Sequence, residues 1–253
     1  MRKRVRAIAL LAGVGAALPG ACLGEEETLV LRTLAECARA LDKDPAAARE
    51  AAARGRVLGD GAPARSCEAY ALEALGAERL AAVRLTDLAQ DRGVVLSAAE
   101  RGKLLEEAAA LWSALGAPQI ARDALAAAAR LGAPVAGALA AAEAELGNWS
   151  AVLAALGPED AAPALRVRAL TELRRWSEAR QALAGLAGPA HDLAAARLAL
   201  AEGDRATAGR RLAAVPQDSA WAEERQALVQ ALAGAQRTIR PRLRDDGLHE
   251  NGR

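Results

Sequence analysis

Aromatic side chains are almost missing from this chain, and their scarcity limits the folds that it can adopt. The 253 residues include no Phe, one Tyr, four Trp and one Met, although aromatic residues usually fill much of a single compact core. Ala and Leu, two of the best helix formers, dominate instead. Val, Ile and Thr, which favour strands, are sparse. We therefore expect an all-α protein whose helices approach one another closely.

An excess of charge of one sign is also missing. Lys and Arg together number 33 and Asp and Glu number 32, which gives a formal net charge of +1. Acidic and basic residues are mixed along the predicted helices. A surface that binds nucleic acid requires a basic stripe, so we expect no nucleic-acid partner.

Residues suited to catalysis are few. The two histidines are His191, near a predicted helix start, and His249, near the C-terminus. The sequence contains no Gly-x-Ser-x-Gly, Walker-type loop, His-Glu-x-x-His or Gly-x-Gly-x-x-Gly motif. The adjacent pairs 106–107 and 223–224 are glutamates. Neighbours on a helix point about 100° apart, so we interpret both pairs as solvated faces. We expect no catalytic site, no metal site, no cofactor and no enzymatic activity.

The N-terminus is typical of a bacterial secretory signal peptide over residues 1–24. A basic stretch at 2–6 precedes an apolar stretch at 7–17, and small residues follow as far as Gly24. The apolar stretch is too short for a transmembrane helix, and no later segment is long and apolar enough either. We expect an exported, periplasmic chain with no transmembrane span.

The cleavage point leaves two outcomes open. The Gly20-Ala21-Cys22 end resembles a lipobox, in which Cys22 would carry a lipid anchor and the protein would be an outer-membrane lipoprotein. Pro19, however, stands where a lipobox has Leu. Cleavage after Ala21 or Gly24 would instead release a soluble periplasmic protein.

Cys37 and Cys67 remain once Cys22 is removed or lipidated, and an even pair in an oxidising compartment favours a disulfide. Aligning Leu41 with Leu75 places the two cysteines in successive first helices, one turn apart. The alternative is two buried free thiols. A metal or redox site is not expected, because no Cys-x-x-Cys or paired His accompanies them.

One short pattern recurs along the chain: an apolar helix, a break, often at a small residue, and a second Ala-rich helix. Such helix–turn–helix units cannot bury their apolar faces alone and must stack on neighbours. We expect a helical repeat domain over 25–236 and a disordered, charged tail over 237–253. The breaks lie at Asp42–Asp44, Gly76, Gly116, Gly147, Arg174 and Gly203.

Some helix starts carry their own signals. Ser97 precedes Glu100 by three residues, which is the spacing of a capping box. Asn148 and Asp204 are predicted to cap the helices that follow them. Trp149 and Trp176 take equivalent places after successive breaks, so we expect both rings to pack in the core rather than to stack on a ligand.

These features resemble degenerate tetratricopeptide repeats over roughly residues 28–235, or a related helical-hairpin solenoid. That family favours a small residue at the turn, an aromatic residue two places later and Ala five places after the turn. The turn residue and Ala are matched by Gly76 with Ala81, Gly116 with Ala121 and Gly203 with Ala208; the aromatic residue is matched by Trp149 after Gly147 and by Trp176, with Ala179, after Arg174.

The resemblance implies an α-solenoid of stacked antiparallel helix hairpins with a binding groove lined by the first helices. Arg168 and Arg197 would share one register and form a basic strip for an acidic segment. The alternative is that their stems cover Ala-rich helices while the charged heads stay in water. The groove positions that the resemblance implies are Tyr70, Glu73, Lys103, Glu106, Arg168, Glu172 and Arg197.

The sequence therefore favours a non-enzymatic, exported scaffold or adaptor that binds another envelope protein or a peptide segment. Two alternatives stay open. One is a lipid-anchored component of outer-membrane assembly, and the other is a helical accessory subunit of a cell-envelope enzyme.

Overall fold

The computed structural model describes residues 37–57, 61–157, 162–218 and 220–237. In these ranges the chain forms helices joined by turns, and no strand occurs among them. The expected all-α class is confirmed for this part of the chain. The predicted signal peptide, Cys22, His249 and all but the first residue of the predicted tail lie outside the described residues.

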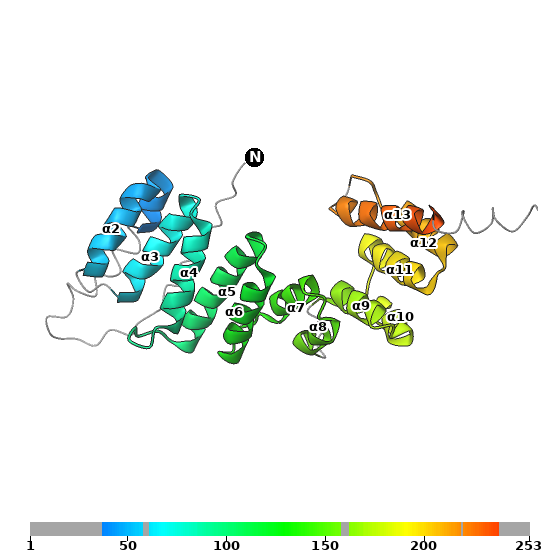
Figure 1. Cartoon of the computed structure of the whole chain (residues 1–253), viewed down its shortest axis with the longest axis horizontal. Coiled ribbons are helices and arrows are strands. Elements are labelled where there is room, and N and C mark those ends of the chain that lie inside the picture. Colours follow the sequence, from blue (N-terminus) through cyan, green and yellow to red (C-terminus); the bar gives the residue numbers. More distant parts are fainter. Residues whose placement is uncertain (1–36, 58–60, 158–161, 219, 238–253) are drawn as a thin grey trace, which may run out of the picture. The chain divides into compact units, whose positions relative to one another are not determined.

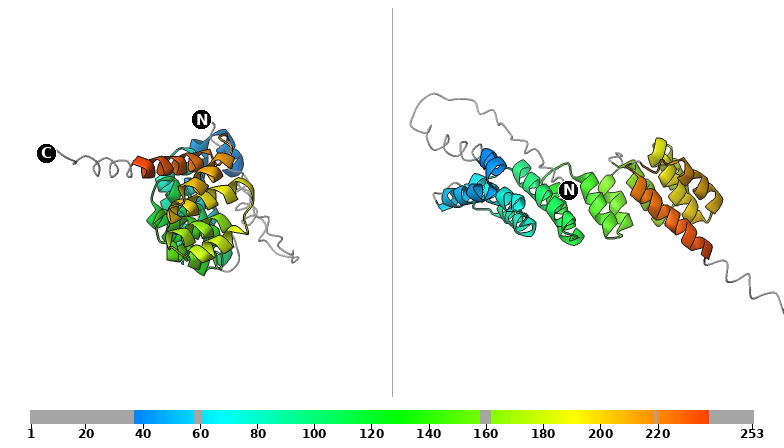
Figure 2. Two further views of the ribbon diagram at one scale, coloured as in Figure 1. Left: turned by 90° about the vertical axis from the view of Figure 1, so that its right-hand side faces the viewer. Right: turned by 90° about the horizontal axis from the view of Figure 1, so that it is seen from above.

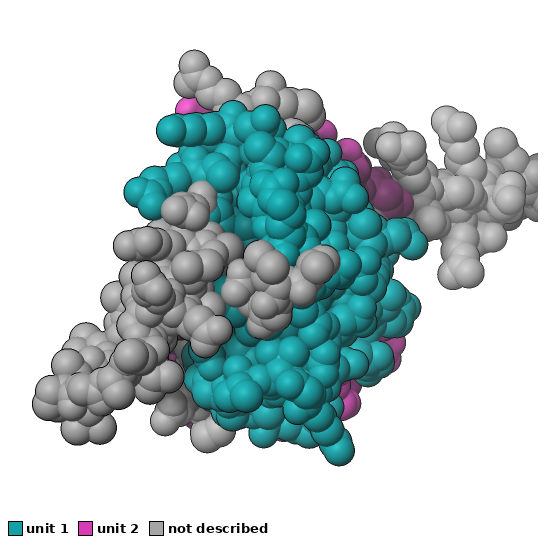
Figure 3. All heavy atoms as spheres, turned by 90° about the vertical axis from the view of Figure 1, so that its left-hand side faces the viewer, with its two compact units in different colours: residues 1–135 teal, residues 136–253 magenta. Residues whose placement is uncertain are grey.

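The chain divides into two compact units, residues 1–135 and 136–253 (Figure 3). In the first unit, residues 37–43 are helical and successive helices pack against each other from α2 to α6 (Figure 1). The helices after residue 43 are α2 (Pro45–Val57), α3 (Gly61–Ala74), α4 (Glu78–Gln90), α5 (Ala98–Ala114) and α6 (Pro118–Arg130).

In the second unit, each helix contacts the next one along the chain (Figure 2). In addition, α7 contacts α9, α9 contacts α11, and α11 contacts α13. The single repeat domain expected over 25–236 stays a prediction. The helices are α7 (Ala136–Glu145), α8 (Trp149–Leu156), α9 (Pro163–Glu172), α10 (Trp176–Leu183), α11 (Gly188–Glu202), α12 (Arg205–Ala214) and α13 (Ala222–Arg237).

Five turns, all at break residues found in the sequence, share one backbone geometry, and a sixth turn that was not predicted, at Gly132 after α6, has it too. The break residue has a positive φ of 58° to 85° in each turn. The N–H of the next residue donates to the carbonyl five positions back, as Ala77 does to Leu72 and Arg175 does to Leu170, both at 2.8 Å. This is the Schellman ending of a helix. The five predicted turns join α3 to α4, α5 to α6, α7 to α8, α9 to α10 and α11 to α12.

The burial pattern around the five predicted turns is also shared. The residue five places after each of these five breaks is Ala or Val and is completely buried. The residue nine places after the same break is a buried Leu. Small side chains at the first position allow the paired helices to approach closely, while the Leu side chains fill the space further along. The first set is Ala81, Ala121, Val152, Ala179 and Ala208, and the second is Leu85, Leu125, Leu156, Leu183 and Leu212.

Two of the three predicted helix caps are confirmed. Ser97 and Glu100 form a complete capping box at the start of α5, and the Asp204 carboxylate accepts from the N–H of Thr207 at 2.9 Å. The third is wrong, because Asn148 precedes α8 without capping it. Its amide donates instead to Glu143 Oε2 at 2.7 Å, so a charged acceptor takes the side chain away from the backbone.

The predicted cysteine pair is confirmed. Cys37 and Cys67 form a disulfide with their Cα atoms 6.1 Å apart. It joins the helical segment 37–43 to α3 and lies in a small buried cluster with Ala52, against which Leu41 packs.

Candidate binding surfaces

In the first unit, a polar contact joins α3 to α5 and involves Tyr70, one of the predicted groove residues. The Tyr70 hydroxyl donates to Glu107 Oε2 at 2.8 Å, and both side chains are half-buried. Burial, the charge of Glu107 and this hydrogen bond raise the pKa of Tyr70, and Glu73 adds to the effect. The phenol is therefore a permanent donor that links the two helices.

Each adjacent glutamate pair is divided between water and a protein partner, which corrects the interpretation of both pairs as solvated faces. Glu106 and Glu223 are exposed. Glu107 accepts from Tyr70, and Glu224 forms an ion pair with Arg197 at 2.8 Å. The 100° rotation between helical neighbours explains the division, since only one member of each pair faces the adjoining helix.

In the second unit, Arg168 on α9 lies over the ring of Trp149 on α8. The guanidinium carbon is 5.0 Å from the ring centroid, within the range of a cation–π interaction. Trp149 itself packs against a buried cluster that includes Val152 and Leu156. The ring therefore does what the sequence predicted, packing on the core, and also presents a face to a cation, which was not predicted.

The positive charge of Arg168 is only partly compensated by the residues around it. Burial and the nearby Arg197 lower its pKa, while the carboxylates of Glu172 and Glu224 oppose this shift. The Nε atom is buried and has no hydrogen-bond partner among the described residues. Arg197, in contrast, is paired with Glu224 on α13.

The seven groove positions thus fall into two groups, one in each unit. In the first unit Tyr70 and Glu73 interact on α3, while Lys103 and Glu106 lie on α5, whose Glu107 bonds Tyr70. In the second unit the charges of Arg197 and Glu172 both act on Arg168. Sequence reasoning missed Glu107 and Glu224 as partners. The sequence showed only that each belongs to an adjacent glutamate pair, whose members point about 100° apart on a helix, and the partner residue could not be identified from that pair.

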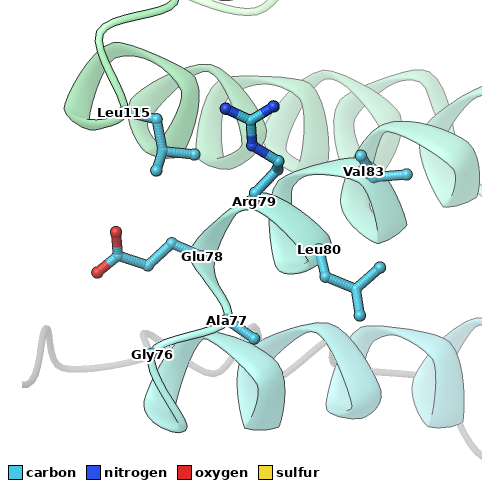
Figure 4. A pocket seen from close by; sticks show the side chains of 7 residues that line it. All are labelled: Gly76, Ala77, Glu78, Arg79, Leu80, Val83 and Leu115. Atoms are coloured by element: carbon cyan, nitrogen blue, oxygen red, sulfur yellow. The ribbon is translucent and has the colours of Figure 1, made fainter.

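A separate hollow of about 480 Å³ lies at the turn between α3 and α4 (Figure 4). Leu115 reaches it from the end of α5, and the other lining residues come from the turn and from α4. Leu80 is 42% exposed there, and Leu75, in the same turn, and Ile120, in the first turn of α6, are each 46% exposed. None of the predicted groove residues lines this hollow.

A second, polar hollow of about 240 Å³ lies among α2, α3 and α4. Arg56 and Arg84 both approach the Glu68 carboxylate, at 3.4 and 3.8 Å, and Glu68 is largely buried. Arg65 pairs with Asp91 at 2.5 Å. These cations are matched by carboxylates within the unit, so the hollow is held together by its own ion pairs.

No three His, Cys, Asp or Glu residues in the described ranges are grouped as metal ligands. No helix in the same ranges has the length and apolar character that crossing a membrane requires. Comparison of the chain with protein-family models, with curated proteins and with solved structures finds no match.

Proposed function

We propose that this chain is an exported, non-enzymatic scaffold, built from tetratricopeptide-like helix hairpins, that binds another protein of the cell envelope. The observation that carries the proposal is the recurrence of one turn geometry with one burial pattern at five places. Repeats of this kind stack on their neighbours and present extended surfaces for a partner.

In each unit, the proposed binding surface is formed by the first helices of the hairpins, which carry the groove positions of that unit. Their polar side chains are held by contacts between different helices, such as Tyr70 with Glu107 and Arg197 with Glu224. A surface fixed in this way loses little side-chain entropy on binding, which favours recognition by a preformed scaffold.

Site-directed photo-crosslinking in cells tests the proposal. A photoreactive residue is introduced at exposed first-helix positions, Glu73, Glu106 and Glu172, and at exposed second-helix positions, Asp123, Gln181 and Arg210. We expect one discrete adduct from the first-helix positions and none from the second-helix controls. Adducts of equal yield from both sets, or no adduct at any position, would contradict the proposal.

The export part of the proposal is tested separately. We expect the mature chain in the periplasmic fraction, with an intact mass that corresponds to cleavage after Ala21 or Gly24. A mature chain that begins at Cys22 and carries acyl chains would instead support the lipid-anchored alternative. Recovery of the unprocessed chain in the cytoplasm would contradict both.

A further inference from the structure

Arg168 is a partly buried cation for which the described part of the protein supplies no direct anion. Its Nε atom is buried without a hydrogen-bond partner. No ion pair joins Arg168 to any carboxylate in the described ranges, and its guanidinium lies instead over the face of Trp149. Removing a charge from water without a paired anion is costly, so an arrangement of this kind favours an external anion.

The charges around Arg168 determine how many negative charges a ligand bound there should carry. The groups that influence Arg168 are Arg197, Glu172 and Glu224. Glu224 is bound to Arg197 at 2.8 Å, which neutralises that arginine. Glu172 is exposed on the same helix, four residues after Arg168, and acts on it only at longer range. One guanidinium, that of Arg168, is left without an anion in direct contact. A single positive charge matches one carboxylate better than a dianionic phosphate.

The geometry also limits how the anion approaches. The guanidinium carbon lies over the Trp149 ring, so the ring blocks the approach of a ligand from that side. The Nε atom is sealed from solvent, whereas the terminal Nη groups are not buried in the same way. An arginine edge binds a carboxylate with charge-assisted hydrogen bonds in the guanidinium plane.

We infer that Arg168, oriented by Trp149, binds a carboxylate side chain in an acidic segment of the partner protein. This inference rests on the proposed function, because it names the chemistry of the partner at one part of the proposed surface. Glu224 has a supporting role, since its ion pair removes the charge of Arg197 from competition for the same carboxylate. Glu172 acts against the ligand and limits its affinity.

A defined peptide pair tests the inference with the full-length chain. The probe is a short Glu-rich peptide with an acetylated N-terminus and an amidated C-terminus, so that only side chains carry charge, and the control peptide has Gln in place of every Glu. Binding is measured by fluorescence anisotropy of the labelled peptides at low ionic strength, because salt screens exposed charges. We expect binding of the Glu peptide and none of the Gln peptide.

Variants then assign the binding to Arg168. Arg168→Ala is expected to weaken binding of the Glu peptide about tenfold or more, the usual scale for a charge-assisted hydrogen bond. Arg168→Lys should retain part of the affinity, because it keeps the charge and loses the planar edge. Glu172→Gln should strengthen binding.

Arg211→Ala is the matched control, since it removes one positive charge from the same unit at an arginine already paired with Asp192 at 3.0 Å. Equal losses in Arg168→Ala and Arg211→Ala would show a general charge effect and overturn the inference, as would equal binding of both peptides. If the partner still crosslinks to the first helices while Arg168→Ala binds it normally, the inference fails and the proposed function stands. If no crosslink forms, the proposed function fails.

Discussion

Arg174 holds the same left-handed backbone conformation that Gly147 holds one turn earlier in the chain, with φ of 58° and 72° respectively. Both residues end a helix in the same way. The N–H of Asn148 donates to the Glu143 carbonyl, and that of Arg175 donates to the Leu170 carbonyl. Among the described residues, Arg174 is the one residue other than glycine with a positive φ. The turn at Arg174 therefore keeps the geometry of the others at a cost in backbone strain.

Replacing Arg174 by glycine is expected to stabilise the protein. A non-glycine residue in this conformation costs about 1 kcal/mol relative to glycine, and the Arg174 side chain is exposed, so removing it uncovers no buried surface of its own. Arg174→Gly should therefore raise the free energy of unfolding by about that amount. Urea denaturation of the second unit, followed by circular dichroism, measures the change.

The opposite substitution at Gly147 provides the matched test. A Cβ added there meets no atom within 4 Å, so the cost of Gly147→Ala comes from φ alone. We expect a destabilisation of about 1 kcal/mol. Gly137 lies inside α7, has equal space and no positive φ, so Gly137→Ala should stabilise the helix instead, by up to about 1 kcal/mol. The same sign for both glycine substitutions would disprove this account of the turns.

The sequence was sufficient to locate five of the six turns of this geometry among the described residues, because a break residue and a small apolar residue five places later are local signals. The turn at Gly132, which has Gly137 five places later, was not recognised. The turn at Arg174 was located, although arginine is a poor residue for that conformation, because Trp176 and Ala179 keep their places after it. The surrounding repeat imposes the backbone geometry on this one unfavourable residue.

The polar contacts were not predictable in the same way, because they depend on which helix lies opposite. Glu107 and Glu224 have partners on α3 and α11, far away in sequence. Asn148 had a good capping sequence, but its side-chain amide donates to Glu143 on the preceding helix and its oxygen caps no N–H of α8. The division of the chain after Val135 likewise had no signal that was recognised in the sequence.

The buried alanine after each turn predicts a steric limit on side-chain size. Ala121 is completely buried in α6, whereas Ala129, eight residues along the same helix, is exposed. Ala121→Leu should overpack the contact with α5 and destabilise the protein by about 1–3 kcal/mol. Ala129→Leu, which introduces the same side chain at the surface, should change stability by less than about 0.5 kcal/mol. Thermal unfolding of both variants measures the two effects. Equal shifts in melting temperature would exclude close packing as the reason why a small residue, Ala or Val, occupies this position after each of the five turns.

The capping box at the start of α5 predicts a dependence on both sequence and pH. Ser97 Oγ accepts from the N–H of Glu100 at 3.2 Å, and Glu100 Oε2 accepts from the N–H and the hydroxyl of Ser97, both at 2.7 Å. Ser97→Ala is expected to cost about 1 kcal/mol. These hydrogen bonds hold the pKa of Glu100 below its usual range. The stabilisation is therefore present above the pKa of the unfolded chain and is lost as the pH falls through the lower folded pKa. Stability measured across this acidic range should fall less in Glu100→Gln than in the parent protein, and identical curves would exclude Glu100 as a contributor.

The disulfide predicts how the first unit responds to reduction. The bonded cysteines are separated by 30 residues, for which the chain-entropy model gives a stabilisation of about 3–4 kcal/mol. The buried cluster around the bond holds few large side chains, with Cys37, Ala52 and Cys67 buried and Leu41 packed beside them. We therefore expect reduction, or Cys37→Ser, to release the helical segment 37–43 and α2 while α4 to α6 stay folded. Hydrogen exchange read by mass spectrometry should show faster exchange in residues 37–57 and unchanged protection in α5. Loss of protection throughout the first unit would contradict this, because it would mean that the bond supports the whole unit rather than its first helices.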